Sequence, residues 1–192
     1  HAGPDWPVFE IDNHAGALAM VGHLLALGHR RIAFIAGPPG NYDAGERLRG
    51  FRQAMASWPD AVGSEYPGGF DEASGEQAGK AILAAAERPD AVFAANDMMA
   101  LGCLYAFAQA GLRVPHDIAL AGFDDIPLAR FVHPSLTTMR VSIAQLGGRA
   151  VERLLDQIES GEDAGGTGAD TLSDRQVIAP VLVVRSSCGG TP

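Results

Sequence analysis

The chain has 192 residues, of which 47% are hydrophobic and 19% charged, and its net charge at pH 7 is −9. No apolar run approaches the roughly 20 residues of a membrane-spanning helix, so the composition predicts a soluble globular protein without a membrane partner. The 14 basic residues are scattered and outnumbered by 23 acidic ones, which argues against a nucleic-acid surface within these residues.

Hydrophobic periodicity predicts strands that alternate with helices along the chain. The continuous apolar run RIAFIAG indicates a strand covered on both faces. Pro180 interrupts the last strand and predicts either a sheet edge or two short pieces. The predicted elements are, in order, a strand at 8–11, a helix at 15–27, a strand at 31–37, a helix at 45–56, a weak strand at 64–66, a helix at 72–86, a strand at 91–94, a helix at 98–110, a strand at 118–122, an extended segment at 136–141, a helix at 144–160, a flexible loop at 161–170 and a strand at 177–184.

Strands that alternate with helices of ten or more residues predict parallel βαβ units. The fold class is therefore α/β, with a mainly parallel sheet between two layers of helices. In an open sheet of this kind, ligands bind outside the carboxyl ends of the strands. Polar residues at those ends are the first candidates for a site.

Two polar residues, Asn96 and Asp97, interrupt the apolar stretch VFAANDMMALG between a predicted strand and a predicted helix. Asp97 is predicted to cap the helix, because a carboxylate there can accept free backbone N–H groups and meet the positive end of the helix dipole. One capping residue is enough for the N-terminus of this helix. Asn96 is therefore predicted to contact a ligand instead. The alternative for Asn96 is a second capping role.

Other polar and aromatic residues are predicted at the same edge. Asp124 and Asp125 follow the strand IALAGF, Arg47 opens the helix after RIAFIAGPPG, and Phe70 precedes the next helix. Arg and Asp form charge-assisted hydrogen bonds with hydroxyls or ring nitrogens, and an aromatic ring stacks on the apolar face of a sugar or base. This set favours recognition of a small polar ring.

Motifs for catalysis, metal binding and cofactor binding fail when their spacing is checked. There is no G-x-S-x-G, and GEQAGKA lacks Ser or Thr after Lys80 and follows no strong strand. None of the six His residues forms an i, i+4 pair with an intervening Glu, and Cys103 and Cys188 have no CxxC spacing. We therefore expect a protein that is not an enzyme and has no catalytic residue, no metal and no cofactor.

The chain resembles the effector-binding core of the lactose/galactose repressor (LacI/GalR) family. The resemblance rests on five stretches that cover nearly the whole chain in the right order: GALAMVGHLLALGHRRIAFIAGPPG, ERLRGFRQAM, GGFDEASGEQAGKAIL, PDAVFAANDMMALGCLYAFAQAGLRVPHDIALAGFDDIP and HPSLTTMRVSIAQLGGRAVERLLDQIESG. Any one of them alone would be weak, whereas the combination is highly specific.

The resemblance implies a two-subdomain fold of the periplasmic-binding-protein-like type I, of which this chain holds mostly the C-terminal subdomain. Residues 1–15 would form the hinge and the end of the N-terminal subdomain, and residues 16–138 the C-terminal effector-binding subdomain. Residues 139–172 would cross over to a helix of the N-terminal subdomain and a flexible loop, and residues 173–192 would return as a strand and tail. The chain begins HAGPDWPVFEID, without an initiator Met, and we expect the natural protein to extend upstream.

The resemblance also implies roles for single residues. Arg47 matches the family arginine that grips ligand hydroxyls or a carboxylate, and Asn96 and Asp124 match further ligand-binding positions. Phe70 matches the aromatic residue that stacks beside the ligand. Many members have a polar residue where this chain has Val141, so one hydrogen bond to the ligand is expected to be missing.

Leu101 and the helix around it match the family's dimer interface, with plain core packing as the alternative for Leu101. The function implied is effector binding, with a small sugar or similar polar ring as ligand, in a cytoplasmic homodimeric regulator. DNA would be bound only through an N-terminal headpiece absent from this chain. The rival hypotheses are a periplasmic-type sugar-binding protein for transport or chemotaxis, and an enzyme acting on a small polyol.

Overall fold

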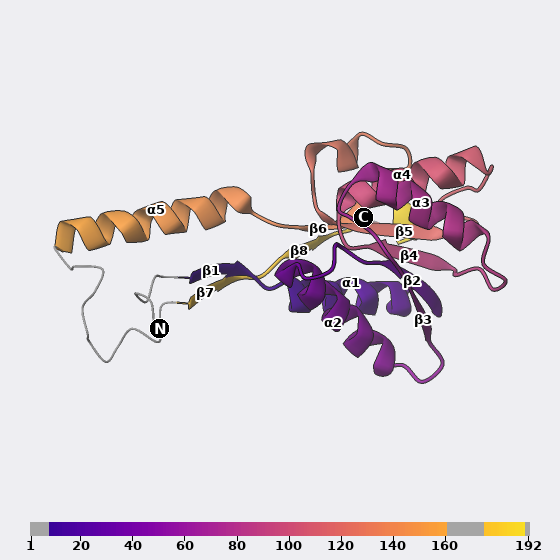
Figure 1. Ribbon diagram of the computed structural model, residues 1–192, viewed down its shortest axis with the longest axis horizontal. Helices are drawn as coiled ribbons and strands as arrows, with labels where there is room; N and C mark the ends of the chain where they lie inside the picture. Colours follow the sequence, from indigo (N-terminus) through magenta and orange to yellow (C-terminus); the bar gives the residue numbers. More distant parts are fainter. Residues whose placement is uncertain (1–7, 161–174, 191–192) are drawn as a thin grey trace. The chain divides into compact units, whose positions relative to one another are not determined.

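The computed structural model describes residues 8–160 and 175–190 (Figure 1). The chain divides into two compact units. The smaller unit comprises His1–Asp12 and Ser142–Ala179, and the larger comprises Asn13–Val141 and Pro180–Pro192. The loop predicted for residues 161–170 lies outside the described residues.

The larger unit is built on a six-stranded sheet with the strand order β3-β2-β4-β5-β6-β8. The first five strands in this order are parallel, and β8 pairs with β6 in the antiparallel direction. This arrangement confirms the predicted α/β class with a mainly parallel sheet. The strands are β2 (Arg31–Ile35), β3 (Val62–Tyr66), β4 (Ala91–Ala94), β5 (Ala119–Asp124), β6 (Thr137–Arg140) and β8 (Val181–Val183).

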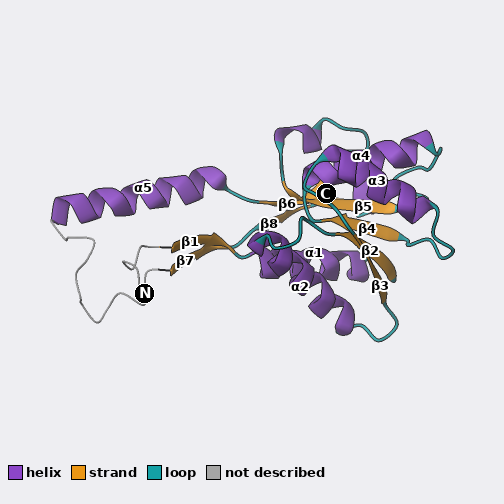
Figure 2. Ribbon diagram, in the orientation of Figure 1, coloured by secondary structure: helices purple, strands orange, loops and turns teal. Residues whose placement is uncertain are grey.

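Helices cover both faces of this sheet, as Figure 2 shows. Helices α1 and α2 lie on one face, and α3 and α4 lie on the other. The chain runs from β2 outward to β3 and then returns to β4 on the other side of β2. The topological switch point of the sheet therefore lies between β2 and β4. The helices are α1 (Asn13–Ala26), α2 (Tyr42–Ala56), α3 (Glu72–Leu83) and α4 (Asp97–Gln109), with short 3-10 turns η1 (Pro127–Arg130) and η3 (Ser186–Cys188).

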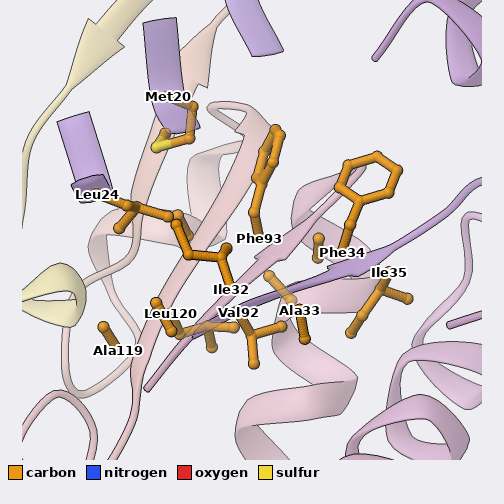
Figure 3. Close-up of a cluster of buried hydrophobic side chains, with 14 of the residues drawn as sticks. Met20, Leu24, Ile32, Ala33, Phe34, Ile35, Val92, Phe93, Ala119 and Leu120 are labelled. Atoms are coloured by element: carbon orange, nitrogen blue, oxygen red, sulfur yellow. The ribbon is translucent and has the colours of Figure 1, made fainter. Parts of the chain in front are cut away.

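The core lies where the central strands β2 and β4 meet the helices (Figure 3). Ile32 to Ile35 and all four residues of β4 are buried, because helices cover both faces of these strands. The ring of Phe34 stacks on Phe51 from α2 at 5.0 Å and contacts Phe93 of β4 at 5.3 Å. These contacts fix α2 against the sheet and so fix the position of residues on that helix.

The smaller unit contains a two-stranded parallel sheet and one long helix. Strand β1 (Val8–Ile11) pairs with β7 (Arg175–Ile178), and α5 spans Ile143–Ser160. Strands β7 and β8 are the two short pieces predicted on either side of Pro180, and they belong to different sheets. No helix among the described residues is long and apolar enough to cross a membrane.

Helix α2 begins three residues earlier than the apolar pattern predicts, at Tyr42 instead of Gly45. The side chain of Asn41 accepts a hydrogen bond from the backbone N–H of Ala44 at 2.9 Å and caps the helix there. Strand β3 is also longer than predicted, because parallel pairing with the whole of β2 extends it to Val62.

Helices α3 and α4 approach each other so closely that only glycine fits at their crossing. A Cβ added to Gly102 would collide with the carbonyl oxygen of Glu72, and one added to Gly75 would collide with the carbonyl oxygen of Met99. By contrast, a Cβ added to Gly45 on α2 meets nothing within 4 Å.

We expect Gly102→Ala to lower the free energy of unfolding by about 1–3 kcal/mol, because the two helices must move apart. The matched substitution Gly45→Ala should raise it by about 0.5–1 kcal/mol, since alanine restricts the unfolded chain and favours the helix. Urea unfolding followed by circular dichroism measures both. Equal effects of the two substitutions would contradict the close crossing of α3 and α4.

Candidate functional site

The four residues predicted to bind a ligand lie together at the carboxyl edge of the six-stranded sheet. The Arg47 Nη2 atom lies 3.3 Å from Asp124 Oδ1, and its guanidinium carbon lies 5.8 Å from the centre of the Phe70 ring. Asn96 donates a hydrogen bond from Nδ2 to the carbonyl oxygen of Phe70 at 2.9 Å. Their proximity follows from the parallel strands, whose carboxyl ends meet at one edge.

Arg47 extends from α2 across the switch point of the sheet. Its Nη1 atom donates to the carbonyl oxygen of Ala95, directly after β4, at 2.5 Å. Its Nε atom donates to Oδ1 of Asn13 at 2.7 Å. The guanidinium also lies 3.9 Å from the centre of the Phe123 ring. The side chain is thus held in one orientation at the place where open α/β sheets bind ligands.

Arg47 has more N–H donors than its contacts with Asn13, Ala95 and Asp124 use. A guanidinium has five N–H donors, and Asn13, Ala95 and Asp124 engage one of the three nitrogen atoms each. These three contacts leave one N–H on each terminal nitrogen unused. Burial lowers the pKa of Arg47, while Asp124 and then Asp43 oppose that shift.

Asp124 faces Arg47 from the end of β5. Burial raises the pKa of this carboxyl, and the positive charge of Arg47 partly opposes the effect. The side chain is 36% exposed, so solvent reaches part of it. The backbone oxygen of Asp124 accepts a hydrogen bond from the N–H of Val141.

Phe70 adopts a left-handed backbone conformation with φ of 70°. Its ring lies over the loop that follows β2, where a Cβ added to Gly37 would approach two ring carbons to 2.5 Å. The absence of a side chain at Gly37 therefore makes room for the ring. The ring ends up half-buried beside the guanidinium of Arg47.

The capping roles of Asn96 and Asp97 differ from the prediction. Asn96 is the N-cap of α4, because its Oδ1 atom accepts the backbone N–H of Met99 at 2.9 Å. The prediction that Asp97 caps this helix is wrong. The Asn96 side chain joins the start of α4 to the backbone of Phe70, and its role as a ligand contact stays a prediction.

Asp97 is fully buried and belongs to a hydrogen-bonded network between α4, β6 and the chain after β5. Thr138 donates to Oδ1 at 2.6 Å, and the backbone N–H of Ile126 donates to Oδ2 at 2.9 Å. Gly122 leaves room for the carboxylate, since a Cβ there would collide with Oδ1. Burial raises the pKa of Asp97 to about 7, although both hydrogen bonds oppose the shift.

The sequence reasoning missed Asn13, which is buried at the start of α1. Besides accepting the Nε–H of Arg47, it donates to Oδ1 of Asp43 at 2.9 Å. The only sequence signal was an amide directly after a strand, the position that drew attention to Asn96. Among residues 8–160 and 175–190, no group of three His, Cys, Asp or Glu residues is placed to hold a metal ion.

Leu101 lies on α4 away from this edge and is half-buried. Tyr105, one helical turn further along, is exposed. The structure thus leaves part of this helix face open to solvent, and the predicted dimer contact at Leu101 stays a prediction.

The chain is similar in sequence to transcriptional regulators. The periplasmic binding protein-like domain matches residues 21–188. The HTH-type transcriptional repressor PurR of Haemophilus influenzae (strain PittEE) is 35% identical over 189 residues, which cover 96% of this chain and 55% of the repressor. The chain therefore spans about half the length of the curated relatives that it matches.

Two solved structures extend the similarity to the fold. A LacI family transcriptional regulator from Enterococcus faecium with bound ribose superposes with a TM-score of 0.84 at 25% identity, over 97% of this chain and 67% of that one. The dimeric Lac repressor with an 11-residue C-terminal deletion superposes with a TM-score of 0.82 at 33% identity, over 93% of this chain and 62% of that one.

We expect Asp97→Asn to change the pH dependence of stability. The folded-state pKa of about 7 lies above the ordinary 3.8, so the wild-type chain loses stability as the pH rises through this interval. Asparagine cannot ionise, so the variant does not lose stability in this way. Its free energy of unfolding, relative to that of the wild type, should rise by up to about 1.4 kcal/mol per pH unit between pH 5 and 7. Urea unfolding across pH 4–8 measures the difference.

Asp117→Asn is the matched control. Hydrogen bonds from Arg113 lower the pKa of this exposed carboxyl to about 2. Its contribution to the free energy of unfolding is therefore lost only as the pH falls below about 4. The difference in the free energy of unfolding between Asp117→Asn and the wild type should be constant between pH 5 and 7. A constant difference for Asp97→Asn as well would show that Asp97 ionises at its ordinary pKa.

Proposed function

The chain belongs to the periplasmic binding protein-like domain family of LacI-type regulators, and on that premise we propose that its larger unit binds a small sugar or similar polar ring as an effector. The observation that carries the proposal is the position of Arg47. It bridges the switch point of the sheet and keeps two N–H donors, beside the carboxylate of Asp124 and the ring of Phe70.

Each of these residues has a chemical role in the proposal. The two remaining N–H groups of Arg47 can donate to neighbouring hydroxyls, and the Asp124 carboxylate can accept from a third. The Phe70 ring covers the apolar face of the ligand ring. Asn96 holds Phe70 in place and offers its second amide hydrogen. The ribose bound by the similar Enterococcus faecium regulator supports a ligand of this class.

The proposed regulator has further parts. Residues 16–138 would form its C-terminal effector-binding subdomain, with residues 139–172 crossing to the N-terminal subdomain and residues 173–192 returning. In this proposal the whole protein binds DNA, through an N-terminal headpiece that is absent from this chain. The whole protein would act in the cytoplasm. Effector binding would act as a switch, by favouring one of two conformations in proportion to the difference in affinity.

A periplasmic-type sugar-binding protein for transport or chemotaxis is the second candidate. It uses the same fold and a similar edge of the sheet. The similarity to a helix-turn-helix repressor over 96% of this chain favours the regulator.

The proposal is tested by calorimetric titration of the full-length natural protein with ribose, a panel of other mono- and disaccharides, and purine bases. We expect one member to bind, and Asp124→Asn to weaken its binding by about 1.5–3 kcal/mol, or roughly 10- to 100-fold, because a charged acceptor is lost. Asp124→Asn is a cleaner test than Arg47→Ala, because Arg47 is only 7% exposed and its removal also breaks its contacts with Asn13 and Asp124 and leaves a space in the protein.

Asp117→Asn, at an exposed ion pair with Arg113, is the control and should bind as the wild type does. Unchanged affinity in Asp124→Asn would refute the assignment of the site. If no sugar or base binds, the proposed ligand class is wrong.

We also propose a homodimer through α4 around Leu101, as the dimeric state of the similar Lac repressor supports. Leu101→Ala should weaken self-association by about 1 kcal/mol or more, because apolar area at the interface is lost. Analytical ultracentrifugation measures the dissociation constant. Val62→Ala, at an exposed position on β3, is the control. A monomeric wild type, or equal effects of both variants, would contradict the proposed interface.

A further inference from the structure

The turn that carries Asp124 has an unfavourable backbone conformation. Asp124 and Asp125 are consecutive non-glycine residues with φ of 113° and 58°. L-residues rarely adopt positive φ because Cβ then crowds the backbone, and such conformations persist only where the surroundings hold them. The position of the Asp124 carboxylate therefore depends on whatever holds this turn.

Two arginines hold the side chain of Asp125. Its Oδ1 atom accepts from Nη2 of Arg185 at 2.6 Å, and its Oδ2 atom accepts from Nε of Arg140 at 2.6 Å. The Asp125 side chain is 8% exposed, Arg185 15% and Arg140 54%. Because water screens an exposed ion pair more strongly, Arg185 makes the stronger of the two contacts.

Arg185 is itself fixed in place by β6 and the chain before it. Its Nη1 atom donates to the carbonyl oxygen of Leu136 at 2.7 Å. Its backbone N–H donates to Oγ1 of Thr137 at 2.8 Å, and the Thr137 hydroxyl lies 3.0 Å from the carbonyl oxygen of Arg185. Hydrogen bonds thus hold both the backbone of Arg185 and the terminal nitrogen that does not contact Asp125. The side chain is therefore a rigid support for Asp125.

The same C-terminal segment has a separate attachment to the sheet. The hydroxyl of Ser187 donates to the carbonyl oxygen of Leu120 at 2.6 Å and accepts the N–H of Thr137 at 2.8 Å. Ser187 thus bridges β5 and β6 without contacting Asp125. Docking of the segment and support of the turn are carried by different side chains.

We propose that Arg185 is a positioning residue of the ligand site: through Asp125 it holds the turn that directs the Asp124 carboxylate towards Arg47. The inference rests on the proposed function of Asp124 and adds to it a residue that is 60 positions beyond Asp125 in the chain. Arg185 itself does not touch the ligand. Its effect on affinity is exerted through the backbone of Asp124 and Asp125.

The test compares Arg185→Gln, Arg185→Lys and Ser187→Ala in the full-length natural protein. The first readout is the intraresidue Hα–HN nuclear Overhauser effect of Asp125, which is strong when φ is near 58° because the two protons are then close. The second is the Kd for ribose. We expect Arg185→Gln to lose the strong signal and to raise Kd by roughly tenfold, as loss of a charged hydrogen bond predicts.

Arg185→Lys keeps the charge and should restore part of both readouts. Ser187→Ala loosens the same segment, so it should lower the unfolding midpoint while leaving the Asp125 signal and Kd unchanged. A strong Asp125 signal and an unchanged Kd in Arg185→Gln overturn the inference, as does an equal rise of Kd in Ser187→Ala.

The two readouts separate this inference from the proposed function. If wild type does not bind ribose, Kd is measured with the sugar or base that binds in the panel titration, and if none binds, the Asp125 signal alone decides whether Arg185 holds the turn. If Arg185→Gln does not fold, Arg185→Lys takes its place, because a lysine ammonium lacks the planar fork that reaches Leu136 and Asp125 together. A signal in Arg185→Lys equal to that of wild type then overturns the inference.

Discussion

The buried guanidinium of Arg47 is the interaction on which the rest of the site depends. Moving a charge out of water is unfavourable unless hydrogen bonds and an opposite charge replace the water. Here Asn13, the carbonyl oxygen of Ala95 and Asp124 replace it, and they come from α1, the end of β4 and the end of β5. One side chain therefore fixes the relative positions of three elements at the edge where the candidate site lies.

The sequence predicted the parts of the fold that local physics determines. The apolar runs at β2 and β4 identify central strands, because only strands covered on both faces lack polar residues. The same logic predicted which residues lie together, since polar residues that follow such runs, at Asn96 and Asp124, lie at the carboxyl edge of a parallel sheet. The earlier start of α2 was also readable, because Asn41 is a good N-cap that the apolar pattern alone overlooked.

The remaining features depend on partners far away in the sequence. Asn96 and Asp97 are both suitable caps, and the choice is made by Thr138 and the N–H of Ile126, which bind the carboxylate of Asp97. Asn13 is separated from Arg47 by 34 positions, and Asp125 from Arg185 by 60. Periodicity reports which face of an element is buried, but it does not report which polar groups meet across the sheet.

Three neighbouring carboxylates at this edge show that surroundings, more than residue type, assign a role. Hydrogen bonds from Arg140 and Arg185 outweigh burial and lower the pKa of Asp125, so it carries a fixed charge suited to holding a turn. Asp124 has one arginine beside it, which does not outweigh burial, so its pKa is raised. Asp97 has no arginine among its hydrogen-bond partners, and burial brings its pKa to about 7. Its protonation then changes near neutral pH, so the stability of the network that Asp97 forms with Thr138 and the backbone of Ile126 depends on pH.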